Sequence, residues 1–180
     1  MEKRNVTVEE KKGLRSTRNL ILVGVMMAVG VVLRLFAGVI AVGNMHPNFL
    51  IATYCLSIYV IRPNLKEAAI IGLISGAISQ IGTSMAWLGL GSETLGAIAM
   101  CLLCYLPLPK VVKPVICTFI ATCISGYAFV GLAAITYANP MPLAQFISMS
   151  TVTLVTALLN MVIVTVLSVP VNKVLGLGQN

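Results

Sequence analysis

Six long apolar runs, separated by short polar breaks, constrain this chain more than any other feature. They cover residues 19–42, 47–62, 66–87, 92–109, 113–137 and 143–170. A helix needs roughly 20 consecutive apolar residues to cross the hydrocarbon core of a bilayer, and most of these runs approach that length. Apolar residues make up 58% of the 180 residues and charged residues only 9%, too few polar side chains to cover a water-soluble surface. The sequence therefore predicts an all-α integral membrane bundle of six transmembrane helices.

The breaks between the runs are rich in Gly, Pro and Asn, which interrupt helices. Because these connectors are short, we expect consecutive helices to be antiparallel in one compact bundle. The second and fourth runs are short for a membrane crossing, so these segments are candidates for tilted, irregular or re-entrant helices. A count of five helices is the main alternative.

The basic residues indicate the orientation of the bundle. Eleven of the 12 Lys and Arg residues fall in the first 18 residues, in the even-numbered connectors or near the C-terminus, and the odd-numbered connectors contain none. Cytoplasmic loops of membrane proteins carry this excess, so both termini are expected to be cytoplasmic. The predicted organisation is a basic tail (1–18), a membrane domain (19–173) and a short C-terminal tail (174–180). The net charge of +7 then reports topology and not a nucleic-acid partner.

Two charged residues fall outside the cytoplasmic segments. Arg34 lies about 15 residues into the first run, in the expected outer half of the membrane. Its guanidinium either faces the bundle interior, where it would hold a carboxylate, or extends to the outer headgroups. Glu93 lies at the expected outer start of the fourth helix. It is a candidate to accept an ammonium group or to pair with Arg34, or it is a carboxylate at a helix start.

Uncharged polar residues gather toward the same outer side. The first outward connector, 43–49, contains Asn44, His46 and Asn48, of which Asn44 or His46 is expected to cap the next helix. In the third and sixth runs, polar residues follow helical spacing that aligns them on one face. They are either contacts between helices or the wall of a pocket that opens to the exterior. The candidate pocket residues from these segments are His46, Asn48, Gln80, Thr83, Thr153 and Asn160.

The same sequence argues against an enzyme. It contains no recognisable catalytic triad, no HExxH, no Walker A sequence and no paired carboxylates within the apolar runs. Its single His and its CxxC pair, Cys101 and Cys104 in an apolar run, do not form a metal site. We expect no catalytic residue, no metal and no cofactor. Proton or sodium coupling is also poorly supported, because Glu93 is the only acidic residue near the membrane.

Several stretches resemble a known family. The runs GVMMAVGVVLRLF, NMHPNFLIA and IIGLISGAIS are similar, in order and spacing, to segments of the bacterial tryptophan-transporter family within the substrate-binding S subunits of energy-coupling factor transporters. SGYAFVGLA and LLNMVIV also look related. The family's turn more often has Lys and Asp where this chain has His46 and Asn48. The similarity covers most of residues 20–170.

The resemblance implies a mechanism for solute uptake. S subunits of this family bind a vitamin or an amino-acid-like solute in an outer cavity. They then associate with a membrane coupling subunit and two ATP-binding subunits and topple to release the solute inside. By resemblance, Met45, Pro47 and Asn48 belong to a turn that closes the cavity, and Gly24 and Ala28 to the face that docks on the coupling subunit.

The expected function is therefore ATP-driven uptake of a small solute across a bacterial cell membrane by a multi-pass protein. Tryptophan or a similar amino acid is the first candidate, because Arg34 would suit its carboxylate and Glu93 its ammonium. A vitamin-like solute is the second. A standalone secondary carrier and a membrane scaffold without transport activity are the alternatives outside this family.

Overall fold

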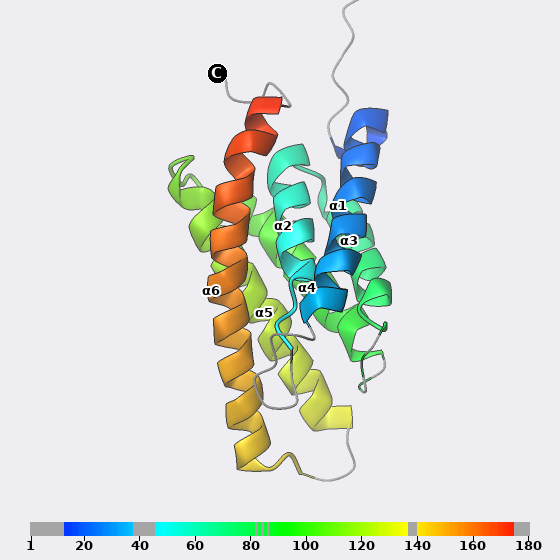
Figure 1. Cartoon of the computed structure of the whole chain (residues 1–180), viewed down its shortest axis with the longest axis vertical. Helices are drawn as coiled ribbons and strands as arrows, with labels where there is room; N and C mark the ends of the chain where they lie inside the picture. Colours follow the sequence, from blue (N-terminus) through cyan, green and yellow to red (C-terminus); the bar gives the residue numbers. More distant parts are fainter. Residues whose placement is uncertain are drawn as a thin grey trace, which may run out of the picture.

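The computed structural model describes residues 13–37, 46–81, 83, 85, 87–136 and 140–174, and within them the chain is a helical bundle (Figure 1). A 3-10 helix, η1 (Gly13–Arg15), precedes the α-helices. These are α1 (Thr17–Ala37), α2 (Leu50–Ile61), α3 (Leu65–Ile78), α4 (Leu88–Cys104), α5 (Val112–Thr136) and α6 (Leu143–Val174). The all-α prediction is confirmed over this part of the chain. The start of α1 and the end of α6 lie at the same end of the bundle.

Three of these helices are long and apolar enough to cross a membrane, namely α1, α5 and α6. Their outward faces carry exposed apolar side chains such as Leu20, Val25 and Val162, which suit a lipid environment. The chain is thus a membrane-embedded protein. α2 and α4 are also apolar but have only 12 and 17 residues, or about 18 and 26 Å of helix at 1.5 Å per residue.

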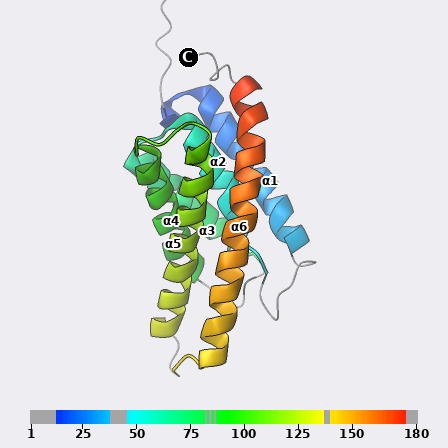
Figure 2. The same cartoon turned by 90° about the vertical axis from the view of Figure 1, so that its left-hand side faces the viewer.

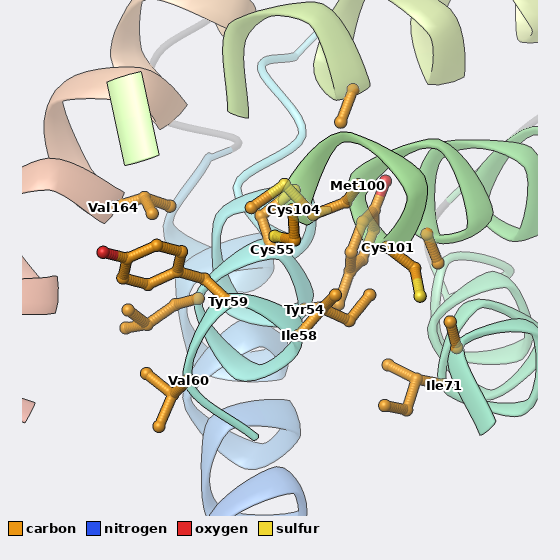
Figure 3. Close-up of a cluster of buried hydrophobic side chains, with 14 of the residues drawn as sticks. Tyr54, Cys55, Ile58, Tyr59, Val60, Ile71, Met100, Cys101, Cys104 and Val164 are labelled. Carbon is orange, nitrogen blue, oxygen red and sulfur yellow. The ribbon is translucent and has the colours of Figure 1, made fainter. Parts of the chain in front are cut away.

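α2 is the central helix of the bundle. All of its residues from Leu50 to Ile61 are buried, and it contacts each of the other five α-helices. Figure 3 shows its side chains among residues of α3, α4 and α6, including Ile71, Met100 and Val164. A helix that is apolar all round is stable only when protein or lipid surrounds it completely. Because protein covers α2, its length need not match the thickness of the bilayer.

The break between α2 and α3 occurs where the sequence predicts it. Arg62 has a left-handed conformation with φ of 48°, and its N–H donates to the carbonyl of Ile58, which ends α2. Pro63 follows and cannot continue the helix. Asn64 then begins α3 with a capping box, in which its side chain accepts from the backbone N–H of Glu67 and the Glu67 carboxylate accepts from the N–H of Asn64.

The predicted third helix over 66–87 is wrong in its second half. α3 ends at Ile78, and residues 79–81 form a turn. Arg34 binds the backbone at this helix end, since its Nη2 and Nε donate to the carbonyls of Ser79 and Ile81, at 2.5 Å and 2.9 Å. Gln80 and Thr83 therefore do not continue the helical face of Gly76 as their spacing predicts.

The fourth helix begins earlier than residue 92. Trp87, at φ of 70°, precedes α4, and its backbone N–H donates to Gln80 Oε1 at 2.7 Å. Gly89 and Gly91 fall in the predicted break between the third and fourth runs, but they lie inside α4. Gly89 is needed there because a Cβ at this position would collide with the Ser79 side chain.

Glycines allow α3 and α4 to pack backbone against backbone. A Cβ at Gly76 would lie 2.6 Å from the Leu90 Cα, and a Cβ at Gly72 would lie 2.6 Å from the Thr94 Cα. The small residues of α3 thus serve packing within the chain. By contrast, Gly24 and Ala28 of α1 are exposed, and a Cβ at Gly24 would meet nothing within 4 Å.

This difference predicts that a Gly→Ala substitution destabilises the protein at Gly76 but not at Gly24. We expect Gly76→Ala to lower the free energy of unfolding by about 2 kcal/mol, because the Cβ meets backbone atoms that cannot rotate away. Gly24→Ala adds the same methyl group in open space and should leave stability unchanged or slightly higher. Thermal unfolding of both variants in detergent measures the difference. Equal stability of the two would contradict the close α3–α4 packing.

Candidate functional site

A cavity of about 850 Å³ is lined by segments that lie away from the start of α1 and the end of α6. Figure 2 shows where these helices lie in the bundle. The cavity wall is formed by the end of α1, the residues before α2, the turn after α3, the start of α4, the second half of α5 and the first half of α6. Such a volume falls in the range of small-molecule sites. The cavity is therefore the candidate functional site.

Most of the predicted pocket residues line this one cavity. The lining includes Arg34, His46, Asn48, Thr83, Glu93 and Thr153. Gln80 and Asn160 are not among the lining residues, and Met45 lies outside the described part of the chain. That the lining residues bind a solute stays a prediction.

Glu93 is buried, with 3% of its surface exposed, and lies in the second turn of α4. The hypothesis of a carboxylate at the helix start is therefore wrong, because α4 begins at Leu88, ahead of the predicted residue 92. Asn48 Nδ2 donates to Glu93 Oε1 at 2.5 Å, and Ser125 Oγ donates to Glu93 Oε2 at 3.2 Å. The carboxylate thus joins the segment before α2 to α4 and α5.

Further buried polar groups surround this carboxylate. The Tyr54 hydroxyl of α2 is close to Glu93 and Ser125, but it makes no hydrogen bond with the described residues. A Cβ at Gly96, one turn after Glu93, would collide with that hydroxyl, so the glycine makes room for it. Asn160 of α6 donates through Nδ2 to the Asn48 carbonyl at 3.1 Å. Asn160 therefore fixes the segment that contacts Glu93, although it does not line the cavity.

Arg34 faces the bundle interior, as one of its two predicted orientations requires. It lines the cavity, and two of its three nitrogen atoms donate to the carbonyls of Ser79 and Ile81. These carbonyls follow the end of α3, where a cation is favourable. No ion pair joins Arg34 to Glu93 among the residues described here. Arg34 thus has a structural role in addition to its place in the cavity wall.

Gln80 makes a contact between helices, one of its two predicted roles, whereas the first connector differs from its predicted role. Gln80 donates to the Gly76 carbonyl and accepts from Trp87, so it holds the turn between α3 and α4. No side chain caps α2 at its N-cap residue, Phe49, but Asn48 Oδ1 accepts from the Leu50 N–H at 3.3 Å. His46, one of the two predicted caps, is exposed at the cavity, and the other, Asn44, lies outside the described residues.

Sequence reasoning missed the contribution of α5. Thr122 and Ser125 line the cavity and are almost fully buried, and Thr118 precedes them on the same helix face. Their spacing of i, i+4 and i+7 is helical, as are the spacings that identified the polar faces of the third and sixth runs, and it could have identified this face. The Thr122 and Thr118 hydroxyls have no hydrogen-bond partner within the described chain.

The remainder of the cavity wall is largely apolar and includes Ile51, Phe129, Val130, Met149 and Val152. The cavity thus combines one buried carboxylate, one guanidinium and several hydroxyls with apolar walls, the composition of a site for an amphipathic small molecule. Over the described ranges no cluster of His, Cys, Asp or Glu could hold a metal ion. The five cysteines are free, and Cys101 and Cys104 lie in the last turns of α4.

Comparison with protein-family models, with curated protein sequences and with solved structures finds no match to this chain. The function is therefore argued from the residues of the cavity and from the membrane-embedded fold. The resemblance to the S subunits remains an expectation based on the short stretches of sequence quoted above.

The hydrogen bond from Ser125 to Glu93 provides a test of the charge on this carboxylate. We expect Ser125→Ala to lower the free energy of unfolding by about 2 kcal/mol, because bonds to charged groups contribute roughly 1.5–3 kcal/mol. Ser57→Ala is the matched control, since the Ser57 hydroxyl is equally buried but donates only to the Thr53 carbonyl of its own helix. Thermal unfolding in detergent compares them. Equal losses for both variants would argue against an ionised Glu93.

Proposed function

We propose that this chain is the membrane-embedded solute-binding subunit of an ATP-driven uptake system of the energy-coupling factor type. Tryptophan or a similar amino acid is the first candidate for the solute. The observation that carries the proposal is the single cavity that joins Arg34 and Glu93 to apolar walls. A transport subunit needs such a site within a membrane-embedded bundle, whereas a scaffold does not.

The proposed orientation has six crossings, both termini in the cytoplasm and the cavity open to the exterior. It is supported by the described Lys and Arg residues, which, apart from Arg34, lie in segments at the opposite end of the bundle from the cavity. Residues that line the cavity include only one of these cations, Arg34. A site that faces away from the cytoplasm is the arrangement expected for an uptake protein.

The outer face of α1 is the proposed contact with the membrane coupling subunit. Gly24 and Ala28 are exposed one helical turn apart, with apolar Val25 and Val29 beside them. Small residues at this spacing allow a helix of another protein to approach closely. Because Gly24 has open space around it within this chain, a larger side chain there would affect partner binding more than folding.

A vitamin-like solute is the second candidate. The cavity volume of about 850 Å³ lies toward the upper end of the range for small-molecule sites, which leaves room for a molecule larger than one amino acid. Both candidates share the same uptake mechanism. They differ in which molecule copurifies with the protein, which native mass spectrometry identifies.

The docking proposal separates solute binding from solute uptake. We expect Gly24→Leu to bind tryptophan as tightly as the unmodified chain but to lose at least about tenfold in ATP-dependent uptake, because the side chain blocks close helix contact. Gly131→Leu is the matched control, since a Cβ at Gly131 on α5 also meets nothing within 4 Å. Binding is measured by equilibrium dialysis, and uptake in cells that also produce the coupling subunit and the ATP-binding subunits.

Two outcomes would contradict the proposed function. If liposomes that contain this chain alone accumulate the solute without ATP, the protein is a secondary carrier. If the chain binds no small molecule in a broad thermal-stability screen, it is a scaffold. Equal uptake by the two leucine variants would overturn the docking face but leave the uptake function standing.

A further inference from the structure

The Glu93 carboxylate forms no ion pair within the described chain, although Arg34 is near enough to interact with it electrostatically. Only neutral donors, Asn48 and Ser125, bond to it, although it is 3% exposed. An ionised carboxylate that is removed from water carries a large free-energy cost unless a cation compensates it. Glu93 also borders the cavity, so a molecule in the cavity can reach it.

The guanidinium that lines the cavity, that of Arg34, is already hydrogen-bonded to backbone carbonyls. Arg34 donates through Nε and Nη2 to the carbonyls that follow α3, and it forms no ion pair with Glu93. Among the described residues, no other Lys or Arg lines the cavity. The Glu93 carboxylate is thus available as an ion-pair partner for a molecule that enters the cavity.

A hydroxyl beside the cavity is also left without a partner. Thr122 Oγ1 belongs to a lining residue that is 1% exposed, and it makes no hydrogen bond within the described residues. Thr122 is on α5, one turn before Ser125, which donates to Glu93. Thr122 thus adds a second polar side chain without a described partner beside the Glu93 site.

We propose that the molecule bound in this cavity carries a cationic nitrogen, that Glu93 is its counter-ion, and that a carboxylate on the molecule is not required. This inference rests on the proposed solute-binding function and narrows its substrate class to protonated amines with an apolar body. The body lies against the apolar wall, and Arg34 acts mainly by holding the end of α3. A zwitterionic amino acid and a cationic vitamin-like molecule both belong to this class.

Three indole compounds that differ only in charge test the proposal on the purified full chain in nanodiscs. Tryptophan has both charged groups, tryptamine lacks the carboxylate, and indole-3-propionic acid lacks the ammonium group. We expect tryptamine to bind within about tenfold of tryptophan. Indole-3-propionic acid should bind about 100-fold more weakly than tryptamine, because the acid has no ammonium group and leaves Glu93 without a partner. Isothermal titration calorimetry gives the three affinities.

A charge-neutral variant tests whether Glu93 is the residue that binds the cationic nitrogen. Glu93→Gln keeps the shape of the side chain and should reduce tryptamine binding by about 100-fold, with a much smaller effect on indole-3-propionic acid. Glu67→Gln makes the same change in the capping box of α3, away from the cavity, and should leave all three affinities unchanged. A thermal unfolding temperature for Glu93→Gln at or above that of the unmodified chain shows that the loss is not caused by unfolding.

The outcomes separate this inference from the proposed function. If indole-3-propionic acid binds as tightly as tryptamine, or if the copurified molecule contains no basic nitrogen, the cation requirement is wrong and solute binding still stands. If none of the indole compounds binds and a molecule with a basic nitrogen copurifies and is lost in Glu93→Gln, the inference is supported. If the chain binds none of them and copurifies with no small molecule, the proposed function fails and the inference fails with it.

Discussion

The buried carboxylate of Glu93 connects the parts of the bundle that form the cavity. It accepts from Asn48 before α2 and from Ser125 on α5, and Asn160 of α6 donates to the Asn48 backbone. Lipid offers no hydrogen bonds, so a polar group in a membrane-embedded bundle is more stable when other groups of the protein bond to it. This requirement draws the segment before α2 onto α4, α5 and α6, and it defines one wall of the cavity.

The close approach of α3 and α4 positions this carboxylate. A Cβ at Gly72 would lie 2.9 Å from the Glu93 carbonyl, and Gly76 lies as close to the first turn of α4. Arg34 ends α3 by binding the carbonyls of Ser79 and Ile81, and Gln80 then holds the start of α4. The same short turn therefore ends one helix, begins the next and contributes to the cavity wall.

Much of the fold could be predicted from the sequence, because apolar runs and helix breakers act locally. The fifth run, predicted over 113–137, agrees with α5 (Val112–Thr136), and the break at Pro63 is found where it is expected. The end of α3 and the start of α4 were not predictable in this way. Distant residues make the contacts there: Arg34, 45 residues earlier in the chain, binds the Ser79 carbonyl, and Gly89 lies against the Ser79 side chain inside α4.

In the candidate site too, local sequence patterns predicted which residues line the cavity, whereas contacts between distant residues could not be predicted. Arg34, Asn48, Glu93 and Thr153 were predictable because polar residues in apolar segments are costly and usually face the interior. The spacing of Thr122 and Ser125 carried the same signal on α5. That Arg34 and Glu93 would line one cavity without pairing depends on the carbonyls after α3, which no local pattern of the sequence reveals.

A structure of the protein with its copurified molecule bound tests the central claim most directly. The account predicts a nitrogen atom of that molecule at about 2.7–2.9 Å from a carboxylate oxygen of Glu93, the distance of a charge-assisted hydrogen bond. Arg34 would still bind the carbonyls of Ser79 and Ile81 in that structure. A bound molecule whose polar groups contact Arg34, while Glu93 bonds only to Asn48 and Ser125, would contradict the account.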